Sequence, residues 1–172
     1  MKIRELMTSQ AFICRPQDSL AEAAALLWQH DCGLLPVVDQ EGRVGATITD
    51  RDICMGAMTR GRPLTELRVA DSMSKDAITC KADEDLDAVV LRMCEHQLHR
   101  LPVVDQDGKV TGMLSLNDLA TYGEHDPRVA GLAQKVLQTV CKHRTTVPAV
   151  EPKPRAAAAP KATAKQAAAG KA

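Results

Sequence analysis

The stretch LPVVDQEGRV at residues 35–44 occurs again as LPVVDQDGKV at residues 101–110, an offset of 66 residues with no gap. The same offset holds outside the stretch, where it aligns Met7 with Met73, Cys14 with Cys80, Leu20 with Leu86, His30 with His96 and Asp52 with Asp118. Self-similarity at a fixed offset indicates repeated structural units. The chain therefore contains two copies of one unit.

Each unit is predicted to run β-α-β-β-α. In the first unit, residues 11–14 form a strand, and Ser19 begins a helix because Glu22 completes a capping box. Gly33 is predicted to end that helix, residues 35–38 and 43–48 make a hairpin around Gly42, and Thr49 begins a second helix. The stripe of the first helix that is predicted to face the core is Leu20, Ala23, Ala24, Leu27 and Trp28. The second unit repeats this order, with strands at 77–80, 101–104 and 109–114 and helices beginning at Asp85 and Ser115.

The C-terminal part has a different pattern. Asp126-Pro127 is typical of a helix start, and apolar residues follow at spacings of three and four up to Val140. This extra amphipathic helix is expected to cover either its own domain or a partner subunit. From Thr145 the chain is rich in Ala, Lys and Pro, which predicts a disordered basic tail, either merely solvated or in weak contact with nucleic acid or another polyanion.

These patterns give five segments. They are unit one at residues 1–58, a connecting loop at 59–66, unit two at 67–122, the amphipathic helix at 123–144 and the tail at 145–172. Hydrophobic residues make up 45% of the chain but aromatic residues only 2%, so the core is predicted to be aliphatic. Residues 151–172 carry five basic and one acidic residue, a net charge of +4, which leaves −4 on residues 1–150 and argues against a core that binds nucleic acid.

Composition and motifs also indicate compartment and class. No apolar stretch is long enough to span a membrane, and the first residues do not resemble a signal peptide, so a cytoplasmic protein is expected. The six cysteines form no CxxC pair and are predicted to be buried and reduced; a redox role or a zinc site is the less favoured alternative. The chain has no HExxH, GxSxG, Walker A or GxGxxG pattern, so no enzyme activity is predicted.

The duplicated unit, with LPVVD, a turn ending in Gly and then [Thr/Ser]-x-x-Asp, resembles the cystathionine-β-synthase (CBS) domain pair, or Bateman module. The resemblance covers about residues 1–122. It implies an α+β fold of two β-α-β-β-α units packed sheet to sheet around a pseudo-two-fold axis, with adenosyl compounds bound in the clefts between them. It also implies a homodimer in which two CBS pairs form a flat disc.

The chemistry of the [Thr/Ser]-x-x-Asp pattern is consistent with such a ligand. Thr49 and Asp52, and again Ser115 and Asp118, place a hydroxyl and a carboxylate at a helix start, where unpaired N–H groups favour a phosphate. The carboxylate suits the two ribose hydroxyls, a role that the family also assigns to these positions. The same pattern is also an ordinary helix cap, and the two interpretations are compatible.

The resemblance further implies an apolar slot for the base, formed by the first strand and the start of the LPVV strand. The implied residues are Phe12, Ile13, Cys14, Leu35 and Pro36 in unit one, and Ile78, Thr79, Cys80, Leu101 and Pro102 in unit two. Arg100 is positioned to reach a phosphate, and unit one has no arginine there. Ala46 stands where the family has a glycine and unit two has Gly112, so site two is expected to be the better occupied.

The predicted function is that of a regulatory sensor. It would bind AMP, ADP, ATP or S-adenosylmethionine, need no obligatory cofactor or metal, and modulate an unidentified partner protein. The alternative is a ligand-free CBS scaffold or stress-response protein that acts through dimerisation and through its C-terminal helix or tail.

Overall fold

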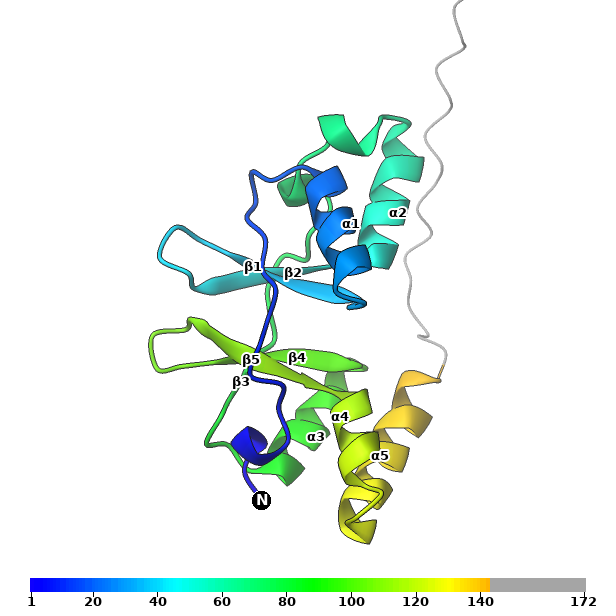
Figure 1. Ribbon diagram of the computed structural model, residues 1–172. Helices are drawn as coiled ribbons and strands as arrows, with labels where there is room; N and C mark the ends of the chain where they lie inside the picture. The colour runs from blue at the N-terminus through cyan, green and yellow to red at the C-terminus, as the bar shows by residue number, and fades with distance from the viewer. Residues whose placement is uncertain (143–172) are drawn as a thin grey trace, which may run out of the picture.

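The computed structural model describes residues 1–142, and Figure 1 shows two stacked halves joined by extended segments. Unit one contains α1 (Leu20–Gln29), β1 (Leu34–Val38), β2 (Val44–Thr49) and α2 (Asp50–Arg60). Unit two contains β3 (Cys80–Lys81), α3 (Leu86–His96), β4 (Arg100–Val104), β5 (Val110–Ser115) and α4 (Leu116–Tyr122), followed by α5 (Pro127–Val140). Short 3-10 helices cover Ile3–Glu5, Leu64–Glu66 and Val69–Asp71. The predicted α+β fold is confirmed.

The two hairpins have matching geometry. β1 pairs antiparallel with β2, and β4 with β5, and each ladder has one irregularity before its last paired residue. The turns place Gly42 at a φ of 83° and Gly108 at 80°, values that side chains with a Cβ rarely adopt. The two sheets face each other with the helices outside (Figure 1), and the hairpins meet where Val44 N–H donates to the Gly108 carbonyl at 3.0 Å. The predicted sheet-to-sheet packing is therefore present.

The first segment of each unit packs against the other unit. We call residues 1–13 and 67–79 the lead-in segments. Ile3, which is fully buried, lies in the core of unit two, and its N–H donates to the Glu84 carbonyl at 3.2 Å. Val69, also fully buried, lies in the core of unit one, and its N–H donates to the Asp18 carbonyl at 2.9 Å. The two units thus exchange lead-in segments across the pseudo-two-fold axis.

The first strand predicted for each unit is shorter than expected. In unit one, residues 11–14 make only an isolated parallel bridge between Cys14 and Val37. In unit two, the strand predicted at 77–80 is β3, which holds only Cys80 and Lys81 and pairs parallel with β4. The lead-in has just crossed from the opposite unit at this point, so it meets the sheet over only one or two residues.

Helix α1 begins as predicted, with Ser19 as its cap and Glu22 completing the capping box. Its end differs from the prediction, because Asp31 rather than Gly33 takes the positive φ, at 47°. Trp28 also departs from the predicted core stripe, since 88% of its surface is exposed. Position 28 lies at the margin of the helix face that packs on the sheet, and no segment among residues 1–142 covers it.

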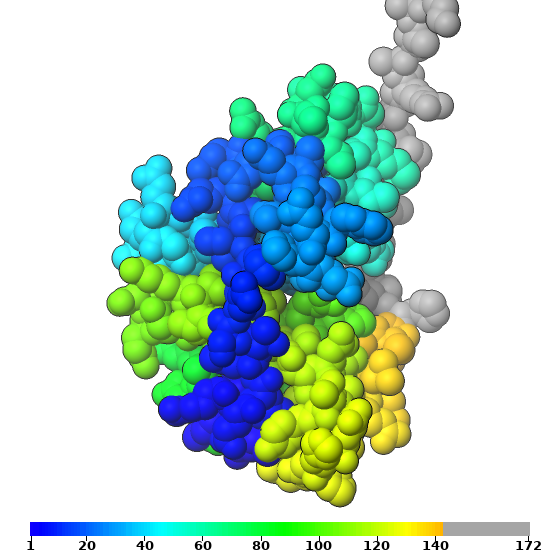
Figure 2. Space-filling model, in the orientation of Figure 1, coloured from blue at the N-terminus to red at the C-terminus, as the bar shows by residue number. Residues whose placement is uncertain are grey.

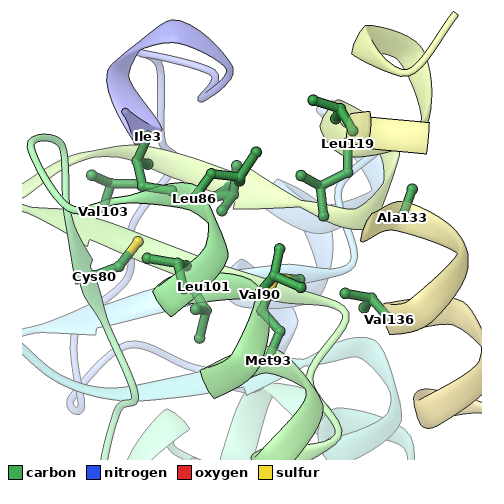
Figure 3. Packing of buried hydrophobic residues seen from close by; sticks show 13 residues of the cluster. Ile3, Cys80, Leu86, Val90, Met93, Leu101, Val103, Leu119, Ala133 and Val136 are labelled. Carbon is green, nitrogen blue, oxygen red and sulfur yellow. The ribbon is translucent and has the colours of Figure 1, made fainter. Parts of the chain in front are cut away.

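Helix α5 completes the core of unit two. Asp126 caps it by accepting from the N–H groups of Arg128 and Val129, and Pro127 occupies its first position. Figure 3 shows Ala133 and Val136 of α5 pointing towards Val90, Met93 and Leu119. The apolar face of α5 is expected to cover either its own domain or a partner subunit, and the structure shows that it covers its own domain.

The cysteines occupy three environments. Cys14 and Cys80 are buried, and burial raises the pKa of both thiols to about 12, so both are protonated at neutral pH. Cys32 and Cys94 are half-buried, while Cys54 and Cys141 are exposed. The prediction of buried cysteines is therefore wrong for the last two, of which Cys54 lies on α2 and Cys141 directly follows α5. All six thiols lie within residues 1–142 and are unpaired there.

The predicted tail at 145–172 lies outside the described residues, as does the end of the predicted segment 123–144. Within residues 1–142, no helix combines the length and the apolar character that crossing a membrane requires.

Candidate functional site

The two helix starts with the [Thr/Ser]-x-x-Asp pattern have the same hydrogen bonds. At α2, Thr49 Oγ1 accepts from Asp52 N–H at 3.2 Å, while Asp52 Oδ2 accepts from Thr49 N–H at 2.9 Å and from Thr49 Oγ1 at 2.7 Å. At α4, the corresponding distances for Ser115 and Asp118 are 3.2, 2.7 and 2.6 Å. The capping interpretation is confirmed at both sites. Each hydroxyl proton points at its own Asp, so a phosphate would compete for it.

Asp118 also receives a contact from the lead-in of unit one. Thr8 Oγ1 donates to Asp118 Oδ1 at 3.2 Å, and the backbones of Thr8 and Met113 exchange two hydrogen bonds of 2.9 Å. Figure 2 shows the blue N-terminal segment running over the front of the molecule from the lower half to the upper half. The Asp118 carboxylate therefore lies at the seam between the two units, with both oxygens engaged.

Asp52 in unit one lacks the equivalent contact. Ser74, the counterpart of Thr8, accepts from Thr47 N–H at 2.9 Å and donates to the Asp76 carbonyl at 3.0 Å. Among residues 1–142, no donor reaches Asp52 Oδ1. One of the two carboxylates thus keeps an open acceptor, and the other is tied to the opposite lead-in.

Gly112 explains this difference. A Cβ on Gly112 would lie 2.5 Å from the Thr8 carbonyl oxygen, so only glycine permits this lead-in to approach. Ala46 occupies the same place in unit one and is buried, and there the Ser74 hydroxyl replaces a backbone carbonyl as the acceptor for Thr47 N–H. At Gly112, the space that a Cβ would need is therefore taken by the backbone of the opposite lead-in.

Arg100 reaches from β4 of unit two towards unit one. Its guanidinium Nη1 is 2.9 Å from the place where a Cβ on Gly33 would stand, so it lies against the backbone between α1 and β1. Burial raises the pKa of the neighbouring Cys32 thiol, and the positive charge of Arg100 offsets part of that rise. No carboxylate among residues 1–142 forms an ion pair with Arg100. The guanidinium is thus placed at the seam, where an anionic group can meet it.

The ten residues implied for the base slot divide into core and surface. Six of them are buried: Cys14, Leu35, Pro36, Cys80, Leu101 and Pro102. Phe12, Ile78 and Thr79 are half-buried, and Ile13 is exposed. The Phe12 ring stacks on the His30 ring with 3.4 Å between centroids, so one of its faces is already covered. The four lead-in residues are the ones a ligand can reach without rearranging the core.

A cleft of about 430 Å³ lies beside the lead-in of unit one, within the size range of small-molecule sites. One wall is Ser9, Gln10, Ala11 and Ile13, and the other comes from the hairpins, with Gly42, Lys109, Val110 and Thr111. Ile13 is the only implied base-slot residue that lines it. The sequence pattern does not predict Ser9, Gln10 or Thr111 as site residues, and it predicts Lys109 only as part of the hairpin. No group of three or more His, Cys, Asp or Glu residues within 1–142 is arranged to hold a metal ion.

Comparison with known proteins places these features in a family. The family model "CBS domain" matches residues 3–56 and again 68–125. The CBS domain-containing protein YhcV of Bacillus subtilis is 36% identical over 118 residues, which cover 69% of this chain and 82% of that protein. L-aspartate semialdehyde sulfurtransferase of Methanocaldococcus jannaschii is 26% identical over 118 residues, but these are only 22% of that enzyme. The relative named as an enzyme therefore matches this chain through one part only.

Among solved structures, the CBS domain pair of protein MJ0100, in complex with 5′-methylthioadenosine and S-adenosylmethionine, aligns with a TM-score of 0.65 and 25% identity. The alignment covers 73% of this chain and 97% of that chain. The repeat, the fold and the family model agree, and the chain belongs to the CBS domain family.

Proposed function

We propose that this protein is a regulatory module that binds an adenosyl compound at the seam between its two units. The observation that carries the proposal is the capped carboxylate at each helix start, of which Asp118 lies within contact of the opposite unit's lead-in. A carboxylate in this position can accept hydrogen bonds from both ribose hydroxyls. The MJ0100 domain pair supports the ligand class, since both of its ligands carry an adenosyl group.

The seam also supplies groups that can discriminate between adenosyl compounds. Arg100 favours a ligand with a phosphate, because its guanidinium has no carboxylate partner among residues 1–142. The N–H groups at the starts of α2 and α4 favour a negative charge as well. A nucleotide such as AMP is therefore preferred over 5′-methylthioadenosine, which has no phosphate.

Regulation follows from where the contacts lie. Thr8 reaches Asp118 from unit one, and Arg100 reaches Gly33 from unit two. A ligand that replaces either contact changes how tightly the two units are held, and ligand binding then differs between the two arrangements. A partner protein that contacts both units would sense that change.

The test is calorimetric titration with AMP, ADP, ATP, S-adenosylmethionine and 5′-methylthioadenosine, with Asp118→Asn and Asp52→Asn as the variants. Asparagine can still accept a hydrogen bond for the cap, but it has only one acceptor oxygen and no charge to strengthen hydrogen bonds from the ribose hydroxyls. We expect one adenosyl compound to bind. Where the substituted carboxylate belongs to an occupied site, the affinity of that site should fall about 10- to 100-fold. Arg100→Ala should weaken phosphate-bearing ligands alone.

Asp126→Asn is the matched control, because Asp126 caps α5 and does not belong to the seam. It should leave the affinity unchanged. Unaltered binding in the double Asp52→Asn, Asp118→Asn variant would contradict the ribose contact. If no adenosyl compound binds the unmodified protein, the ligand-free scaffold is the better description.

A further inference from the structure

The two carboxylates proposed to hold a ribose differ in how much of each is free. We call Thr49 and Asp52 site one, and Ser115 and Asp118 site two. At both sites the Oδ2 atom accepts from the backbone N–H and the hydroxyl of the cap residue. The Oδ1 atom of Asp118 also accepts from Thr8 Oγ1 at 3.2 Å, whereas nothing within residues 1–142 donates to Oδ1 of Asp52. Only site one therefore offers a carboxylate oxygen with all of its acceptor capacity free.

This difference matters for a ligand that presents two neighbouring hydroxyl groups, as a ribose does. Each hydroxyl donates one hydrogen bond, and a carboxylate oxygen can accept about two. Oδ1 of Asp52 can therefore accept from both hydroxyls, but Oδ1 of Asp118 already accepts from Thr8. A ribose can use site two fully only after the Thr8 hydroxyl has moved away.

The backbone holds the Thr8 hydroxyl at site two. Thr8 and Met113 exchange two backbone hydrogen bonds of 2.9 Å, and a Cβ on Gly112 would lie 2.5 Å from the Thr8 carbonyl oxygen. Ser74, the counterpart of Thr8, instead uses its hydroxyl to accept from Thr47 N–H at 2.9 Å, so this hydroxyl is turned to strand β2 and not to site one. The obstruction is thus specific to site two.

The lead-in of unit one is attached to β5 at a single residue. Thr8 makes both of its backbone hydrogen bonds to β5, and the backbone at residues 9–13 makes none within the described part of the chain. The lead-in of unit two is tied to β2 at a further point, because Ala77 N–H donates to the Gly45 carbonyl at 3.2 Å. The cleft of about 430 Å³ beside residues 9–13 leaves room for this lead-in to move. The contact at Thr8 can therefore open without disturbing a longer ladder.

The positive charge at the seam also favours site one. The Arg100 guanidinium lies against Gly33, which directly precedes Leu34, and Leu34 pairs with Thr49 in the β1–β2 ladder. The charge is therefore near the start of α2, and no carboxylate of residues 1–142 forms an ion pair with it. The 66-residue offset takes Arg100 to Leu34, so unit one provides no charge from the equivalent position to site two. A ligand with a phosphate is thus favoured at site one.

We infer that Thr8 is an autoinhibitory contact that keeps site two closed until the lead-in of unit one lifts from β5, so that the first adenosyl ligand occupies site one. The inference rests on the proposed function and concerns the order in which the two sites fill. It reverses the order expected from Ala46 and Gly112, because the Thr8 backbone takes the space beside Gly112. Filling site two breaks a contact between the units, so a second ligand changes the arrangement of the pair in a way that the first does not.

The first experiment is calorimetric titration of the unmodified chain, Asp52→Asn and Asp118→Asn with AMP, and with S-adenosylmethionine should AMP not bind. We expect one tight event per unmodified chain and a second event at least about 10-fold weaker. Asp52→Asn should remove the tight event, and Asp118→Asn should leave its affinity within about twofold. Two equal events, or loss of the tight event in Asp118→Asn alone, would overturn the inference and leave the proposed function standing. No binding of either compound to any of the three proteins would remove the proposed function and the inference together.

The second experiment tests Thr8 itself. Thr8→Val removes the hydroxyl and keeps the branched shape of the side chain. In the Asp52→Asn chain, where site two alone keeps its carboxylate, Thr8→Val should raise the affinity for the same compound about 10-fold, because Oδ1 of Asp118 regains its free acceptor. An unchanged affinity would overturn the inference, and a lower one would make Thr8 a contact of the ligand.

Ser74→Ala is the matched control for Thr8→Val. It removes the counterpart hydroxyl from the lead-in of unit two, and that hydroxyl contacts Thr47 and not Asp52. The affinity of site one should therefore stay within about twofold of that of the unmodified chain. A gain at site one as large as the gain at site two would show that the effect does not come from the contact with Asp118.

Hydrogen exchange keeps the inference testable in the unmodified chain should Thr8→Val fail to fold. The N–H groups of Thr8 and Met113 both donate across the contact, so their protection reports whether the lead-in lies on β5. We expect their protection to persist while the first equivalent binds and their exchange to become about 10-fold faster as the second binds. Exchange at Ser74 N–H, which donates to the Thr47 carbonyl, should stay constant. Loss of protection with the first equivalent, or full protection with both sites filled, would refute the proposed opening.

Discussion

Unit one and unit two share their hairpins and caps but differ where the opposite lead-in touches them. In unit two, Thr8 pairs by its backbone with Met113 and by its hydroxyl with Asp118. In unit one, the Ser74 hydroxyl instead contacts Thr47, and Asp52 keeps an open oxygen. Ala46 and Gly112 occupy equivalent positions and differ by one methyl group. The two lead-ins make different contacts beside this position. A small difference in a repeat can therefore make two equivalent clefts chemically unequal.

The largest expected effect on stability is that of Gly112→Ala. The new methyl would stand 2.5 Å from the Thr8 carbonyl, so the lead-in of unit one must shift or the strand must bend. We expect a loss of about 2–3 kcal/mol in the free energy of unfolding, seen as a fall of several degrees in Tm. Ala46→Gly is the matched change in unit one and should cost about 1 kcal/mol. Equal costs for the two variants would show that the close approach of Thr8 is not what requires the glycine.

The caps should show where the two units are alike. Ser115→Ala and Thr49→Ala each remove a side chain that accepts from the N–H of the third helical residue. Each should lower the free energy of unfolding by about 1 kcal/mol in urea titrations. A clearly larger loss for Ser115→Ala would mean that the Thr8 contact makes the Asp118 cap a more stabilising one.

The smallest effect concerns acid stability, where unit two has an ion pair that unit one lacks. Burial alone would raise the pKa of Glu84, but hydrogen bonds from Arg92 and from the Lys81 backbone outweigh it and hold that pKa below its ordinary value. The Arg92 and Glu84 charges are 2.7 Å apart. A depressed pKa stabilises the fold above the ordinary value of 4.5 and loses that contribution as pH falls through the folded pKa.

Glu84→Gln keeps the shape and removes this titration. We expect it to cost about 0.5–1 kcal/mol at neutral pH and almost nothing in acid, measured by urea unfolding across the pH range. Asp18→Asn in unit one is the control, because position 26, the counterpart of Arg92, is a leucine. A Glu84→Gln deficit that persists unchanged in acid would argue against a charge effect.

Local patterns in the sequence predicted the local structure well. Each hairpin was located by its repeated LPVVD stretch and turn glycine, and Ser19, Thr49 and Ser115 cap their helices as expected. The start of α5 at Asp126-Pro127 is correct for the same reason. Such features depend on a few neighbouring residues, and their chemistry is the same in any fold.

Longer-range relations were not predictable in this way. Nothing in residues 1–13 indicates that Ile3 packs in unit two, because periodicity reports which side of a segment is apolar and not which partner it meets. The sequence shows that Ala46 and Gly112 differ at equivalent positions, but the contact that requires the glycine lies more than 100 residues away in sequence, at Thr8. Trp28 was assigned to the core by its spacing, yet the structure exposes it at a face that α5 covers only in unit two.

The exchanged lead-in segments determine the order in which this protein can fold as it is synthesised. Ile3 is made before the helices and strands of unit one, but its neighbours Leu86, Leu101 and Val103 follow only after all of unit one. The core of unit one in turn contains Leu67 and Val69, which belong to the start of unit two and are made after unit one. Neither half has a complete core while the other is missing, and contacts this distant in sequence form late. The pair, and not the single repeat, is therefore the smallest segment of this chain in which both cores are complete.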